Sequence, residues 1–383
     1  MGIRSTSRAL TFVARTLCVV AVFLTLGAAD AGTRRALSRA EVALRQKDYA
    51  EAARHVNEAI ARAPLHAAAH VQRGILNLKQ GDLAGAAASL TRATELDADS
   101  FAARYHLGLA HLRLGELDAA HDEFTRATRL NPEQPLALYH LGVALSGQRK
   151  YGDAARAFEA AVELDPDMSS AYYRWGNAEL RRGNAEDGRA LLAKFRGVKA
   201  QKRIRQAVVR ARRGDSDRAA QLLERALEMD RDHPSAYHAL AFLAFVDGRW
   251  DDAVRHARRY VGLRPASEDM RVLLGAASRR GGEPQVAMDA LAVALDGVAP
   301  HAEARYELAE AHVLAGDLEA AARQFRQAMA DDPTLYQAAY RAGAVLLDLD
   351  RPSEAAVALR EAIAHCPRDQ NPSDPPGDDF FHG

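Results

Sequence analysis

The sequence predicts an all-α protein, an α-solenoid of about ten helix–turn–helix units. Two observations lead to this prediction: small residues recur every 34 residues, and glycine or proline recurs where helices must end. Helices that cross closely need small side chains at the contact, because a larger one overpacks it at a cost of about 1–3 kcal/mol. The composition agrees with a folded chain, since 48% of the 383 residues are hydrophobic and 27% are charged.

Residues 1–31 differ from the rest and predict a secretory signal peptide. Basic residues up to Arg15 precede the apolar run 17–26, and the small residues GAADAG follow it. Cleavage after Ala29 or Ala31 fits this pattern. A spanning helix needs roughly 20 apolar residues, so we expect no stable membrane span, with an uncleaved anchor as the alternative. The mature protein is then expected to be secreted or periplasmic.

The first block of repeats is expected over residues 32–199. Its units begin near residues 33, 67, 101, 135 and 169. The eighth place of each unit is small, and the residues there are Ala40, Gly74, Gly108, Gly142 and Gly176. Glycines at the fifteenth place are expected to end first helices in a left-handed conformation, and in this block they are Gly81, Gly115 and Gly183.

The second block is expected over residues 200–369. Its units begin near residues 200, 234, 268, 302 and 336, with fifteenth-place glycines at Gly214, Gly248, Gly282 and Gly316. The two blocks join at a defective unit, because Gly183 and Gly214 are 31 residues apart instead of 34. Repeat arrays contact only their nearest neighbours, so the deletion must be absorbed locally. We expect a kink or a change of pitch near residues 195–200, and whether it hinges is left open.

Residues 370–383 are expected to form a disordered tail, because proline, aspartate and glycine oppose a packed helix. Phe380 and Phe381 form an aromatic pair on this acidic tail. The pair is either part of an untethered terminus or docks onto a groove. Cys366 would be the only thiol of the mature chain, and no role is assigned to it.

This distribution of small, aromatic and proline places resembles the tetratricopeptide repeat, a helix–turn–helix unit of 34 residues. The resemblance covers residues 33 to about 369. It implies a right-handed superhelix whose concave surface is lined by the first helix of each unit. One such helix pair cannot bury its hydrophobic face alone, which is why the unit is repeated.

No motif predicts catalysis, a cofactor or a metal. His66 and His70 are spaced i, i+4, but no third ligand accompanies them. His106 and His140 recur at the repeat period, which indicates an architectural role. No phosphate-binding loop or nucleophile elbow is present. We expect the protein not to be an enzyme.

The candidate partner-binding residues of the groove lie on first helices. The fifth place is rich in tyrosine, which offers a rigid ring and a hydroxyl at low entropic cost. The predicted contacts of the groove are Tyr105, Tyr139, Tyr173, Asn177, Arg181, Tyr306 and Tyr340. A clamp for chaperone tails is not expected, because the resemblance implies lysine and asparagine where Tyr105 and Leu109 stand. An extended or helical segment with apolar anchors fits better.

A basic segment is the other candidate. Residues 189–213 contain ten Lys or Arg and no Asp or Glu, in a chain of net charge zero. If a stripe through Ile204 and Val208 is buried, then Lys202, Arg205 and Arg212 point to solvent. Such a segment attracts an acidic protein, an anionic glycan or a lipid headgroup, or it is simply a solvated helix face. Nucleic acid is not expected for an exported chain.

The leading functional prediction is an exported scaffold that binds a segment of a partner protein in its concave groove. The alternative is a glycan-handling or assembly factor in cell-envelope or exopolysaccharide biogenesis. Alanine- and arginine-rich composition and the lack of an Asn-X-Ser/Thr sequon favour a bacterial envelope.

Overall fold

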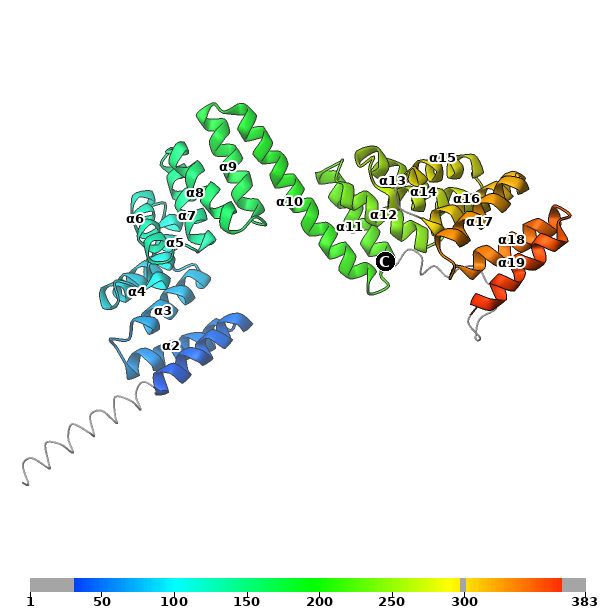
Figure 1. Ribbon diagram of the computed structural model, residues 1–383. Helices are drawn as coiled ribbons and strands as arrows, with labels where there is room; N and C mark the ends of the chain where they lie inside the picture. The colour runs from blue at the N-terminus through cyan, green and yellow to red at the C-terminus, as the bar shows by residue number, and fades with distance from the viewer. Residues whose placement is uncertain (1–30, 297–300, 367–383) are drawn as a thin grey trace, which may run out of the picture. The chain divides into compact units, whose positions relative to one another are not determined.

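The computed structural model describes residues 31–296 and 301–366, and every regular element in these ranges is an α-helix (Figure 1). The predicted fold class, an all-α solenoid, is confirmed. The signal segment, apart from residue 31, and the whole tail 370–383 lie outside the described residues. The described chain divides into two compact units, which meet between Phe195 and Arg196.

In the first unit, an opening helix extends to residue 46. The helices that follow are α2 (Tyr49–Arg62), α3 (Ala67–Gln80), α4 (Leu83–Leu96), α5 (Phe101–Leu114), α6 (Leu117–Leu130), α7 (Pro135–Gly147), α8 (Tyr151–Leu164) and α9 (Ser169–Arg182). Each helix packs on its neighbours in the chain, and the first helices α3, α5, α7 and α9 also contact one another in series. The first helices therefore share one face of the unit.

Helix α10 (Ala185–Ala211) contains the boundary between the units. The second unit continues with α11 (Ser216–Met229), α12 (Pro234–Val246), α13 (Trp250–Leu263), α14 (Glu268–Arg280), α15 (Pro284–Leu295), α16 (Ala302–Ala315), α17 (Leu318–Asp331), α18 (Tyr336–Asp348) and α19 (Pro352–His365). The first helices α12, α14, α16 and α18 begin at the residues where the sequence alignment starts a repeat.

Small residues at the eighth place let a large side chain of the same unit fill the helix crossing. A Cβ atom added to Gly108 would lie 2.8 Å from the ring of Phe124, and one added to Gly142 would lie 2.7 Å from the ring of Phe158. Both phenylalanines are fully buried. The same arrangement recurs in the second unit, where a Cβ on Gly275 would lie 2.4 Å from Leu291. The 34-residue period is thus a period of helix contacts.

The turn between the two helices of a pair takes a left-handed residue at the fifteenth place. Seven of these residues are glycines, with φ between 71° and 90°, as the sequence predicts: Gly81, Gly115, Gly183, Gly214, Gly248, Gly282 and Gly316. Three other residues adopt the same conformation without being glycine, namely Lys47, Arg149 and Asp350. The backbone geometry is therefore common to all ten units, although the residue type is not.

The junction between the blocks is a single helix. Residues 195–200 are α-helical, so the second helix of the unit that starts at 169 continues directly into the first helix of the next unit. No proline occurs between Pro166 and Pro234, and the three deleted residues leave no room for the loop that separates other units. The deletion therefore joins two helices into one, and the helix continues without a break through residues 195–200.

The buried stripe of α10 also differs from the prediction. Ala200, Ile204 and Ala207 are buried, but Val208 is 37% exposed. Ala207, three residues after Ile204, packs against α11, so Val208 at the next position turns toward solvent.

No helix in the described part of the chain is long and apolar enough to cross a bilayer.

Candidate partner-binding cleft

A cleft of about 540 Å³ lies in the first unit, where α7 and α9 run side by side. Val143 and Ser146 of α7 line it, together with Tyr173, Asn177 and Arg181 of α9. The last three belong to the predicted contact set. They lie on one side of α9 because the spacing i, i+4, i+8 places side chains along a single helix face.

Aromatic side chains and guanidinium groups contact one another in this cleft. The Nε atom of Arg174 donates a hydrogen bond to the Tyr139 hydroxyl at 3.0 Å. The guanidinium of Arg181 lies 5.7 Å from the centre of the Tyr151 ring, within cation–π range. Asn177 Nδ2 donates to the backbone oxygen of Tyr173 at 2.7 Å, and Tyr173 is 49% exposed.

The charge of the cleft is positive. Arg149, Arg174 and Arg181 line it, and no Asp or Glu does. None of the three arginines forms an ion pair with a residue that the structure describes. A guanidinium stays charged at any relevant pH and presents a planar fork of donors suited to carboxylates. The cleft can therefore bind an anionic group beside an apolar or aromatic one.

Tyr105 and Tyr139 are the neighbours of Tyr173 along the series of first helices, and both are half-buried. The Tyr105 ring stacks on Phe101 at 5.7 Å and meets His140 edge-on at 5.8 Å. Burial raises the pKa of Tyr105. All three tyrosines contact an aromatic ring, since the Tyr173 ring lies 5.3 Å from that of Phe195, but Tyr173 is more exposed than the other two.

His106 and His140 are structural residues, as their recurrence at the repeat period indicates. Burial lowers the pKa of each to about 4, and nearby cations (Lys79 for His106, Arg174 and Arg113 for His140) add to the shift. Both imidazoles are therefore neutral at physiological pH. The His140 ring stacks on Phe124 at 5.6 Å, which ties adjacent repeats together.

In the second unit, the prediction for Tyr306 is corrected. Its side chain is only 5% exposed and packs edge-on against Phe325, with ring centres 5.5 Å apart. Burial raises its pKa, and its ring cannot present a face to a ligand. Tyr340, the equivalent residue on α18, is half-buried.

Charges on the first helices of the second unit are mostly satisfied internally. Arg279 of α14 binds Glu307 of α16 at 2.6 Å, and Arg341 of α18 pairs with Glu310 of α16. These pairs link successive first helices. Two other arginines of α14 contact different groups: Arg271 donates to the Pro265 backbone oxygen, and Arg280 lies over the rings of Phe245 and Trp250.

The basic residues Lys202, Arg205 and Arg212 are exposed on α10 and just after it, in the second unit. Arg210 lies 3.9 Å from Asp215, a long and partly solvated ion pair. Val208 and Val209 are exposed among these charges. The exposed surface of α10 is therefore basic and also carries apolar side chains.

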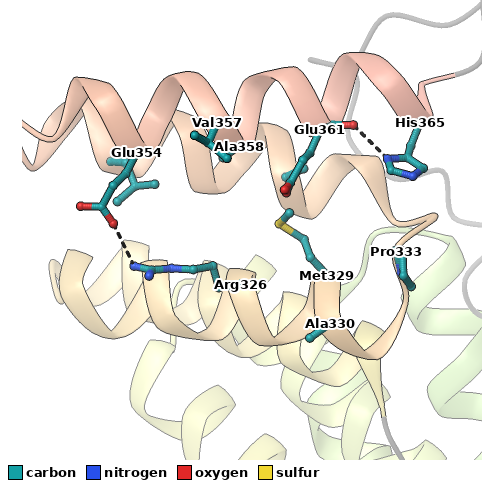
Figure 2. A pocket seen from close by; sticks show the side chains of 11 residues that line it. Arg326, Met329, Ala330, Pro333, Glu354, Val357, Ala358, Glu361 and His365 are labelled. Carbon is teal, nitrogen blue, oxygen red and sulfur yellow. Dashed lines mark hydrogen bonds and ion pairs between the residues drawn. The ribbon is translucent and has the colours of Figure 1, made fainter.

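A second cleft, also of about 540 Å³, lies between α17 and α19 (Figure 2). Met329 and Val357 give it an apolar wall. Arg326 lies 3.8 Å from Glu354 in this cleft, and His365 Nδ1 lies 3.0 Å from the backbone oxygen of Glu361. None of the predicted contact residues lines it.

Sequence reasoning missed Arg149, Arg174 and Tyr151 of the first cleft. Each occupies a different place of the repeat, so no periodic pattern groups them. Arg149 stands at the fifteenth place, where seven other units carry a turn glycine, and this departure from the pattern is the one feature of the sequence that could have drawn attention to it.

The described residues contain no cluster of three or more potential metal ligands. His70 hydrogen-bonds the Pro64 oxygen at 2.8 Å instead.

Comparison with solved structures gives similar proteins of low identity. The MamA protein structure is 24% identical and matches 45% of this chain and 93% of that chain, with a TM-score of 0.41. YrrB, described as a tetratricopeptide repeat protein with an unusual peptide-binding site, is 20% identical over 56% of this chain and 95% of that chain, with a TM-score of 0.39. No curated protein matches the chain.

Family models match most of the sequence. One tetratricopeptide repeat model matches residues 37–103, 71–135, 105–146, 139–200 and 306–375, and a second matches residues 210–276. These matches cover more than half of the chain. The chain therefore belongs to the tetratricopeptide repeat family.

Proposed function

We propose that the protein is a non-enzymatic scaffold that holds a segment of a partner protein across the first helices of its first unit. The fold is that of protein-interaction scaffolds, because it is a tetratricopeptide repeat array. The observation that carries the finer proposal is the α7–α9 cleft. It combines an exposed Tyr173 with three arginines that no described carboxylate neutralises.

This cleft suits an acidic segment with an apolar anchor. Arginine binds carboxylates through two parallel hydrogen bonds, and such charge-assisted bonds are stronger than neutral ones. Tyrosine adds a large contact area with few rotatable bonds, which is why it recurs in the central residues of protein interfaces. Val143 supplies an apolar wall on the opposite helix.

Affinity purification from the native host tests this proposal. Full-length protein with Tyr173→Ala and Arg181→Gln should lose its co-purifying partner. The control is Arg156→Gln, which removes the same charge from an exposed residue of α8, 76% exposed and outside the cleft. A partner that is retained equally by the cleft variant and the control would contradict the proposal.

A second candidate function is glycan handling in envelope or exopolysaccharide assembly. The exposed basic face with Lys202, Arg205 and Arg212 favours it, because a row of cations suits an anionic polymer. Binding of an anionic oligosaccharide that falls when these three residues become glutamine would favour this alternative. Unchanged oligosaccharide binding would remove it.

We also propose that the protein acts outside the cytoplasm, in a bacterial envelope. The basic, apolar and small-residue pattern of residues 1–31 supports this location. Sequencing the N-terminus of protein purified from cell fractions tests it. A mature chain that begins near residue 30 or 32 in the envelope fraction is expected, and an intact Met1 in the cytosol would contradict it.

A further inference from the structure

The arginines of the α7–α9 cleft have a complement in the chain's own sequence. Residues 373–383 read SDPPGDDFFHG and lie outside the described residues. They contain three aspartates and neither lysine nor arginine, and their one run of large apolar side chains is Phe380 and Phe381. The cleft offers the opposite set of groups, namely three arginines, two tyrosines and an apolar wall.

The acidic and aromatic stretch is also about as long as the helix segment between two of these arginines. Arg174 and Arg181 are seven residues apart on α9, which is about 10.5 Å along a helix. From Asp378 to Phe381 an extended chain covers three steps, or about 10 Å. A four-residue acidic and aromatic stretch can therefore place a carboxylate at a guanidinium and a ring beside Val143 or Tyr173.

We propose that this cleft binds residues 374–381 of a second copy of the chain. A carboxylate of the Asp378–Asp379 pair meets the guanidinium group of Arg174 or Arg181, and one phenylalanine ring packs against the apolar wall. The inference rests on the proposed function, because it names an occupant for the same site. The contact joins two different surfaces, so it is heterologous and links copies head to tail.

The occupant would also regulate the scaffold. A partner segment and the tail of another copy compete for the same arginines, so self-association and partner binding oppose each other. Each binding event is expected to weaken with salt, because charge pairs at a surface are screened over roughly 8 Å at physiological ionic strength.

The first test uses a fluorescein-labelled, amidated peptide of residues 373–383 and the full-length protein, with binding followed by fluorescence anisotropy. Arg174→Gln with Arg181→Gln should raise the Kd about tenfold or more, because hydrogen bonds to charged groups are lost. Arg156→Gln is the control and should leave the Kd unchanged. A peptide with Asp378→Asn and Asp379→Asn should bind the unmodified protein as weakly as the unmodified peptide binds the cleft variant. Equal binding by the variant and the control, or no binding of the unmodified peptide, would overturn the inference.

The second test separates a second copy from the same molecule. Sedimentation velocity of the full-length protein should show association that grows with concentration, and free peptide or Phe380→Ser with Phe381→Ser should abolish it. A monomer at every concentration, or association that ignores the tail substitutions, contradicts the inference. If the inference alone fails, the native partner is still lost from the Tyr173→Ala and Arg181→Gln protein. If the proposed function fails as well, that partner is retained.

Discussion

At the scale of single residues, Gly115 and Gly262 differ in backbone conformation. Gly115 adopts a φ of 82°, and a Cβ atom added there would meet no other atom within 4 Å, so its requirement is purely conformational. Gly262 lies near the end of α13 in a helical conformation, also with open space around it. Because neither position is crowded, a comparison of the two isolates the effect of the backbone conformation.

Gly115→Ala should lower the free energy of unfolding by about 1–2 kcal/mol, because an L-residue is strained in the left-handed region. Gly262→Ala, as the matched control, should leave stability unchanged or raise it by up to about 1 kcal/mol. Urea unfolding of both variants measures the difference. A Gly115→Ala protein as stable as the Gly262→Ala protein would refute the assigned turn conformation.

Protonation of the half-buried His106 and His140 should destabilise the first unit in acid. Burial lowers the pKa of His106 and His140 to about 4, from 6.5 in the unfolded chain. The unfolded state then binds more protons between these values, so stability is complete above pH 6.5 and falls as the pH drops toward 4. His140→Phe keeps the ring stack on Phe124 and should make this pH dependence shallower. An unchanged slope in chemical denaturation between pH 6.5 and 4 would be inconsistent with a buried neutral His140.

At the scale of helices, the sequence predicts the paired helices well and the junction poorly. The contact of Gly142 with Phe158 follows from local rules, since a glycine and a large residue 16 positions later also meet in the units of Gly74, Gly108, Gly275 and Gly343. The two helices fuse in α10 because the loop that separates other units is missing. A deletion removes residues, so it leaves no sequence motif from which the fusion could be predicted.

The residues of the cleft could be predicted only in part, for a similar reason. Asn177 and Arg181 follow the repeat frame, whereas Arg149 and Arg174 gain their role from two neighbouring helices.

Continuity of α10 has a direct test at Gly197. A Cβ there would make an ordinary contact, 3.7 Å from an Asp230 oxygen. Gly197→Ala should therefore raise stability by about 0.8–1 kcal/mol, as for alanine in a helix interior. Urea denaturation gives the value. A destabilised variant would indicate that residues 195–200 are not helical in solution.

At the scale of the whole molecule, the net charge is zero, but the charged residues are unevenly distributed. Ion pairs such as Arg279 with Glu307 link first helices of the second unit, whereas the α7–α9 cleft keeps three arginines without described acidic partners. These three arginines are exposed and attract the carboxylates of a partner, which is why we propose that partner binding occurs in the first unit.

Photo-crosslinking in the native host tests this central claim most directly. A benzophenone amino acid replaces Ser146, which lines the cleft, and in a matched protein it replaces Arg156 on the exposed side of α8. We expect a discrete crosslinked protein from position 146 and none from position 156. No crosslink at position 146, or the same products from both positions, would contradict partner binding in the cleft.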